Sequence, residues 1–104
     1  MAQFDVYHNP NEETNQIVPY LLDIQADLLD NLAIRVVVPL ITASAVGKPI
    51  KYLNPKFQID DITVLMSTVE LAGVPVSAIG EKVDSLKEQR DKIIAALDFL
   101  FVGF

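Results

Sequence analysis

The sequence has no cysteine, no tryptophan and only one histidine, His8. Without cysteine the chain can form no disulfide, thiolate metal site or cysteine nucleophile, and a reducing compartment is compatible with it. A single imidazole has no second imidazole to share a metal ion with, so we interpret His8 as a structural or solvent-exposed residue at a strand end. No motif for a serine nucleophile, a nucleotide phosphate or zinc is present. We therefore expect a cytoplasmic protein that is not an enzyme and needs no cofactor or metal.

Basic residues and long apolar runs are also scarce. There are 8 Lys and Arg residues against 14 Asp and Glu, which gives a net charge of −6. Nucleic-acid affinity depends mainly on clustered Lys and Arg, so this balance argues against direct binding to nucleic acid. The most apolar stretch, residues 93–104, contains Asp98 and is shorter than the roughly 20 residues of a membrane span. The first residues have no basic and apolar leader, so we expect neither a membrane segment nor a secretory signal.

Apolar residues make up 51% of the chain, which is enough for the core of one domain covering residues 1–104. We expect strands at residues 3–8, 18–25, 34–40, 56–59 and 62–68, and a short extended piece at 74–76. In the run 34–40 charged groups stand only near the ends, which favours burial on both faces. Asp60 and Asp61 separate two of these strands and predict a turn.

The C-terminal part of the chain has the periodicity of a helix. Ser85, followed by Glu88 three residues later, matches the capping-box pattern, and we expect a helix over residues 86–101. Its apolar stripe consists of Leu86, Ile93, Leu97 and Leu100, with Ile94 and Phe101 beside them. Its solvated face interleaves Lys82, Lys87, Arg90 and Lys92 with acidic residues. The order of elements predicts a mainly β protein with a C-terminal α-helix packed on a bent antiparallel sheet or small barrel.

Three aspartates, Asp23, Asp27 and Asp30, follow one another at intervals of four and three residues. On a helix they would share one face and suggest a cation site. The strand expected at residues 18–25 does not allow that geometry. We therefore favour an acidic, solvated rim over a metal site.

Two apolar features are unusual for a solvated surface. Leu28 and Leu29 stand together just after a strand, where adjacent leucines cannot both point into one core. The sequence also ends in Phe101-Val102-Gly103-Phe104, whereas chain ends are usually polar. Phe104 either covers the end of the helix or contributes, with the two leucines, to a protein-binding surface.

Several short motifs occur together, in order, over essentially the whole chain. They are Phe4-x-Val6-Tyr7, the run from Leu22 to Asp30, Arg35-Val36-Val37-Val38-Pro39-Leu40, the run from Val74 to Glu81, and the ending Phe101-Val102-Gly103-Phe104. In this arrangement they resemble the CcdB family of plasmid-maintenance toxins. The resemblance implies a homodimer with an SH3-like barrel of the CcdB/MazF type and a C-terminal helix. It also implies a toxin that binds the A subunit of DNA gyrase and traps the cleaved-DNA complex.

The same resemblance implies a labile CcdA-like antitoxin, encoded beside the toxin, through which the pair binds operator DNA and represses its own operon. It assigns the gyrase contact to Leu28, Leu29, Asp30, Asp98, Val102, Gly103 and Phe104. It assigns the antitoxin contact to Tyr7, Asp23, Ala26 and Asp27, with the neighbouring loop 9–15. The family pattern has tryptophan where this chain has Val102, and valine cannot stack on an arginine.

Two alternatives to a gyrase poison stay open. One is an endoribonuclease like the MazF-type toxins, which requires a basic RNA groove and acid–base side chains. A net charge of −6 and one histidine fit that reading poorly. The other is a CcdB homologue that keeps antitoxin binding and operon regulation but has lost gyrase poisoning.

Overall fold

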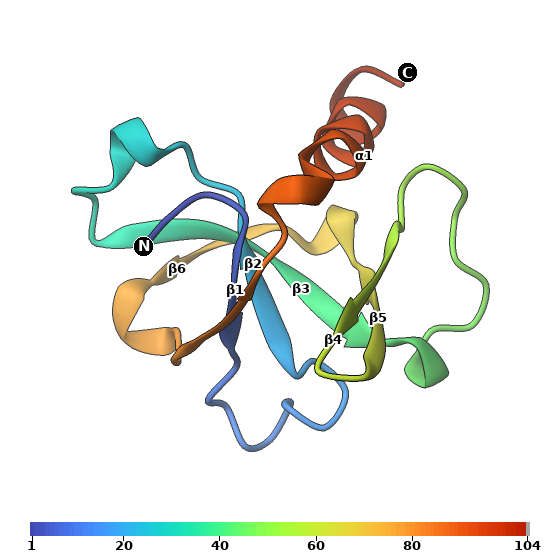
Figure 1. Cartoon of the computed structure of the whole chain (residues 1–104), viewed down its shortest axis with the longest axis horizontal. Coiled ribbons are helices and arrows are strands. Elements are labelled where there is room, and N and C mark those ends of the chain that lie inside the picture. The colour runs from blue at the N-terminus through green and yellow to red at the C-terminus, as the bar shows by residue number, and fades with distance from the viewer. Residues whose placement is uncertain (104) are drawn as a thin grey trace.

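A computed structural model describes residues 1–103 of the chain, so the expectations for Phe104 lie outside the described residues. A bent antiparallel sheet carries the C-terminal helix across one end (Figure 1). The strands are β1 (Asp5–His8), β2 (Tyr20–Asp23), β3 (Ile34–Thr42), β4 (Lys56–Ile59), β5 (Ile62–Met66), β6 (Ala72–Pro75) and β7 (Lys82–Ser85). The helix is α1 (Arg90–Val102), and the 3₁₀ turns are η1 (Asp27–Leu29), η2 (Ala43–Ala45), η3 (Thr68–Glu70), η4 (Val76–Ala78) and η5 (Lys87–Gln89). The expected class, mainly β with a C-terminal helix, is confirmed.

β3 is the central strand. It pairs with β2 along one edge, while its other edge is shared by β6, which lies beside Val36, and β5, which lies beside Leu40. The full strand order is β4-β5-β3-β2-β1-β7, with β6 on β3. β5 and β6 pair with different parts of the same edge of β3. Because these two strands diverge there, the sheet bends into a half-barrel. No residue of β3 after Ile34 is exposed, as its apolar composition predicted.

The hairpin between β4 and β5 turns at Asp60 and Asp61, as expected. Both residues have positive φ angles, 48° and 64°. Two successive residues with positive φ match the right-handed twist of the strands on either side, and aspartate tolerates this conformation better than most side chains. The pairing of Ile59 with Ile62 closes the hairpin directly behind the turn.

The core lies between the concave face of the sheet and α1. Val6, Leu22 and Leu40 are fully buried on the sheet, and Ile93 and Ala96 meet them from the helix. The last turn of α1 leaves this core, since Phe101 and Val102 are exposed. None of the helices within residues 1–103 has the length and hydropathy that a membrane span requires.

The start of the helix differs from the expectation. Residues 82–85 form β7, and Ser85 pairs with Asp5 of β1, so the chain is still extended at the residue expected to cap a helix. The Ser85 hydroxyl accepts from the Lys87 N–H at 3.4 Å, and α1 begins only at Arg90 after η5. The capping-box prediction was therefore wrong. Lys82, assigned to a helix face, is a strand residue whose ammonium group lies 3.3 Å from Asp5.

Gly80 permits the close approach of the chain to the end of β1. A Cβ atom there would lie 2.6 Å from the His8 carbonyl oxygen, which accepts a 2.9 Å hydrogen bond from the Gly80 N–H. We expect Gly80→Ala to lower the free energy of unfolding by about 2 kcal/mol in urea denaturation. Gly47→Ala is the control, because a Cβ there meets nothing within 4 Å, and we expect a change within about 0.5 kcal/mol. Equal stability of the two variants would contradict this account.

Candidate functional site

The connection from β2 to β3 presents adjacent leucines to solvent. It contains η1, and we call residues 26–30 the leucine turn. Leu28 is 92% exposed, Leu29 is 49% exposed, and Leu32 and Ile34 continue the exposed apolar surface. No residue of η1 is buried, so neither leucine serves the core. An apolar surface of this kind is typical of a protein contact.

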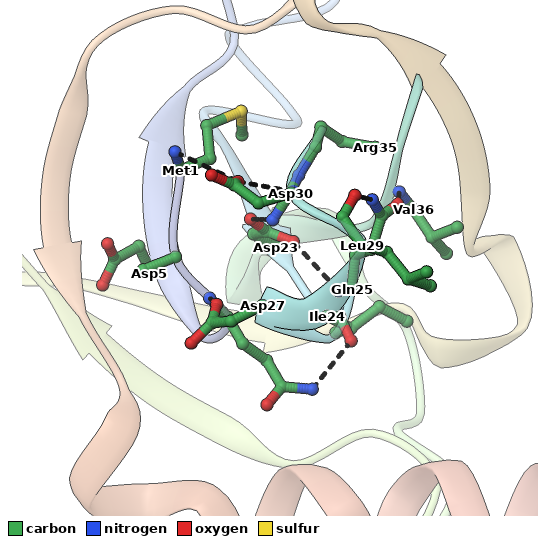
Figure 2. Close-up of polar contacts among 12 residues, drawn as sticks. Met1, Asp5, Asp23, Ile24, Gln25, Asp27, Leu29, Asp30, Arg35 and Val36 are labelled. Atoms are coloured by element: carbon green, nitrogen blue, oxygen red, sulfur yellow. Dashed lines mark hydrogen bonds and ion pairs between the residues drawn. The ribbon is translucent and has the colours of Figure 1, made fainter. Parts of the chain in front are cut away.

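A buried ion pair lies beneath the leucine turn. Arg35, on β3, is 1% exposed and donates to Asp23, at the end of β2, which is fully buried. The other amino group of Arg35 donates to Asp30 at 3.0 Å, and the N-terminal ammonium of Met1 lies 3.5 Å from the same carboxylate (Figure 2). Arg35 therefore joins the end of β2 to the end of the leucine turn.

The expectation of an acidic, solvated rim was wrong for Asp23. Its carboxylate accepts from Arg35 and, at 2.9 Å, from the Gln25 N–H. Burial raises the pKa of Asp23 above its ordinary value, although both donors act in the opposite direction. Asp27 and Asp30 are exposed and bind other partners, so the three aspartates do not converge on one point.

The charge of Arg35 predicts a measurable effect on stability. Arg35→Met would leave Asp23 without a cation, and removing one partner of a buried pair costs about 3 kcal/mol. We expect this loss in the free energy of unfolding at neutral pH. Arg90→Met is the control, because Arg90 is exposed and forms no ion pair among the described residues, and we expect a change within about 0.5 kcal/mol.

The same variant tests the pKa of Asp23. A folded-state pKa raised above the unfolded one means that stability falls as the pH rises through the folded pKa. Loss of Arg35 would raise the pKa of Asp23 further. The deficit of Arg35→Met relative to wild type should therefore shrink as the pH is lowered toward the ordinary carboxyl pKa of about 3.9. A deficit that stays constant with pH would contradict the pairing of these two groups.

The residues expected to contact an antitoxin fall into two classes. Ala26 and Asp27 are exposed on the leucine turn, and Asp27 accepts from the Gln3 N–H at 2.7 Å. Tyr7 and Asp23 are buried. Burial also raises the pKa of Tyr7, whose hydroxyl lies 3.4 Å from the Ala2 nitrogen. Of these four residues, only Ala26 and Asp27 can therefore touch a partner without a rearrangement; residues 10–14 of the neighbouring loop are exposed as well.

The far end of α1 presents a second exposed surface. Asp98, Phe101 and Val102 are exposed, and Val102 is 60% exposed at the last helical residue. Gly103 has a φ of 81°, and its N–H donates to the Phe99 carbonyl at 3.0 Å, which ends the helix. Glycine adopts this left-handed conformation without the steric cost of a side chain.

The two surfaces lie at opposite ends of the helix. Asp27 of the leucine turn shares a hollow of about 360 Å³ with Arg90, the first residue of α1. Val102 is the last residue of α1, and a rise of 1.5 Å per residue places it about 18 Å along the axis. Within one chain, the two surfaces expected to contact gyrase are therefore separate patches.

One known protein family matches almost the whole of this chain. The family model described as CcdB protein matches residues 3–103. The chain belongs to the CcdB family. The resemblance of its motifs is thereby confirmed, and membership identifies the chain as the toxin partner of a toxin–antitoxin system.

Two residues of this CcdB-family chain were missed by sequence reasoning. Arg35 and Gln25 are both buried beside the leucine turn and bond to it. The available signal was the charge of Arg35 near the start of a strand expected to be buried on both faces, twelve residues after Asp23. Gln25 gave no signal, because a glutamine after a strand is usually a surface residue.

Proposed function

We propose that this toxin binds the A subunit of DNA gyrase and traps the complex of gyrase with cleaved DNA. The observation that supports this most directly is the outward placement of Leu28, which is 92% exposed at a position that the resemblance to the family assigns to the gyrase contact. When a partner buries an exposed leucine on an ordered turn, the loss of apolar surface exposed to water stabilises the complex. The exposed Val102 at the end of α1 provides the second contact.

We further propose that the toxin acts as a symmetric homodimer. A two-fold axis presents each exposed surface twice, which suits a dimeric gyrase target. Sedimentation at micromolar concentration should give about twice the 11.5 kDa of one chain. A single species at the mass of one chain would contradict the proposal.

The antitoxin of the proposed pair is a small CcdA-like protein with a segment that folds on contact. Ala26 and Asp27 are the exposed contact residues, while Tyr7 and Asp23 are buried. Binding to operator DNA belongs to the antitoxin, because a toxin with a net charge of −6 repels phosphate. The toxin then contributes to operon repression only as part of the complex.

The experiment for the proposed function is a gyrase cleavage assay. Purified toxin is incubated with gyrase, ATP and supercoiled plasmid, and linear DNA should accumulate. Leu28→Asp, which leaves the core untouched, should abolish this accumulation. Absence of linear DNA with wild type, together with a normal antitoxin complex, would assign the chain to antitoxin binding and regulation alone. Cleavage of RNA in a parallel incubation would instead indicate an endoribonuclease.

A further inference from the structure

Gln25 lies under the leucine turn and uses both ends of its side-chain amide. The residue is 6% exposed. Its Nε2 donates to the Leu29 carbonyl at 2.9 Å, and its Oε1 accepts from the Val36 N–H at 2.9 Å (Figure 2). The amide therefore connects the last residue of η1 to β3.

The position of Gln25 is itself fixed from two sides. Its backbone N–H donates to Asp23 at 2.9 Å, and Asp23 is held by the buried Arg35. Val36 follows Arg35 directly on β3. A carbonyl bonded to Gln25 is thus connected to the central strand of the sheet, which pairs with neighbours along both of its edges.

The body of the protein also bonds to both flanks of the leucine turn: Asp27 accepts from the Gln3 N–H at 2.7 Å, and Asp30 accepts from Arg35 at 3.0 Å. Among the described residues, Gln25 supplies the side-chain bond to the segment between them, where the Leu29 carbonyl also accepts from the Leu32 N–H at 3.2 Å. Within the turn, the Leu29 N–H donates to Ala26 at 2.9 Å and the Asp30 N–H to Asp27 at 3.1 Å. None of the η1 residues beside these bonds is buried. An isolated 3₁₀ turn of three residues is weak, so its order depends on contacts with the body of the protein.

We propose that Gln25 is a positioning residue for the protein-binding surface: it holds the Leu29 carbonyl and thereby orders Leu28 and Leu29 before the partner arrives. The inference rests on the proposed gyrase contact of these leucines. Gln25 is buried, so it acts through the turn and makes no contact with the partner. Ordering the turn in advance lowers the entropy lost on binding.

A positioning role differs measurably from a purely structural one. If only a fraction of molecules has the ordered turn, the apparent dissociation constant rises by the inverse of that fraction, and the change appears mainly in the association rate. A residue that contributes to stability alone leaves affinity unchanged as long as the protein stays folded. Affinity and local amide exchange are therefore the deciding measurements.

Gln25→Met is the test variant. Methionine is similar in size to glutamine, but it has no hydrogen-bond donor and its sulfur is only a weak acceptor. Its binding to a purified gyrase A fragment is measured by surface plasmon resonance beside wild type, and exchange of the Leu29, Asp30 and Leu32 amide protons is measured on the free proteins. We expect faster exchange at these three amides and about tenfold weaker binding, mostly through slower association. If Gln25→Met folds poorly, Gln25→Leu replaces it, since leucine also lacks a donor for the Leu29 carbonyl and adds no buried charge.

Thr68→Val is the matched control. Thr68 is fully buried, and its hydroxyl donates to the Leu53 carbonyl, so valine also removes a buried donor to a loop carbonyl. Thr68→Val should lower the Tm to a similar extent and bind gyrase A like wild type. Leu28→Asp is included as a direct contact variant and should lose binding.

The outcomes separate the inference from the proposed function. Weaker binding by Gln25→Met with normal binding by Thr68→Val supports the positioning role. Normal binding by Gln25→Met together with loss of binding by Leu28→Asp overturns it and leaves the gyrase contact in place. Absence of binding by wild type overturns the proposed function, and the inference with it.

Discussion

Val102→Asp is expected to weaken binding to gyrase A by more than about a hundredfold and to abolish toxicity, with the fold intact. Val102 is 60% exposed at the last residue of α1, so a carboxylate there stays in water in the free protein. In the complex the same carboxylate would be removed from water without a partner. The cost of an unpaired buried charge, about 3 kcal/mol, gives this loss of affinity.

Val69→Asp is the control for this substitution. Val69 is 59% exposed on η3, so the chemical change and the exposure match those of Val102, but the position lies outside the surfaces assigned to gyrase. We expect both variants to keep the wild-type Tm, because substitutions at exposed positions change stability by at most about 0.5 kcal/mol. Loss of toxicity in both variants, or in neither, would contradict the assignment of the contact to the end of α1.

Val102→Trp is expected to strengthen binding to gyrase A, because it restores the aromatic residue of the family pattern. A tryptophan face over an arginine contributes about 0.5 to 2 kcal/mol, depending on how far the pair is removed from water. A homodimer presents the position twice. If both copies contact one gyrase dimer, the gain is about 1 to 4 kcal/mol, or roughly fivefold to several hundredfold, less what the valine already contributes by burial.

The sign of the change caused by Val102→Trp distinguishes two arrangements of the contact. Phe101 is exposed beside Val102, and in a shifted arrangement it would already supply the aromatic contact. Tryptophan would then meet a filled site and weaken binding. Isothermal titration of wild type and Val102→Trp with the gyrase A fragment decides between them. Equal affinities would place position 102 outside the contact.

Local patterns in the sequence were sufficient for most of the sheet. The strand β4 was predicted with its observed bounds, because apolar and polar residues alternate between Lys56 and Ile59 and a turn follows at once. β7 was missed, since the residues from Lys82 to Ser85 include only one large apolar side chain. Its extended conformation depends on pairing with β1, nearly eighty positions earlier, and such long-range pairing leaves little trace in a short window.

The candidate site was predictable where exposure follows from the local sequence. Adjacent leucines at the end of a strand cannot share one core, and Leu28 and Leu29 are indeed exposed. Burial of Asp23 was not predictable in this way, because a carboxylate is stable in the interior only when a cation is paired with it, and Arg35 reaches Asp23 only in the folded chain. From the sequence, Asp23 was expected on an acidic, solvated rim and Arg35 near the end of a buried strand, and no local pattern indicated that the two would meet.

The ion pair between Asp23 and Arg35 also restricts how this chain can diverge. Replacing Arg35 alone leaves the buried Asp23 without a cation, and replacing Asp23 alone leaves Arg35 only the exposed Asp30, whereas replacing both with apolar side chains of similar volume is often tolerated. A lineage that loses one of the two therefore passes through a poorly folded intermediate unless the other changes at nearly the same time. Among descendants of this sequence, positions 23 and 35 should therefore change together. In the leucine turn, the solvent-facing side chains should vary more freely than the residues that bond the turn to the sheet.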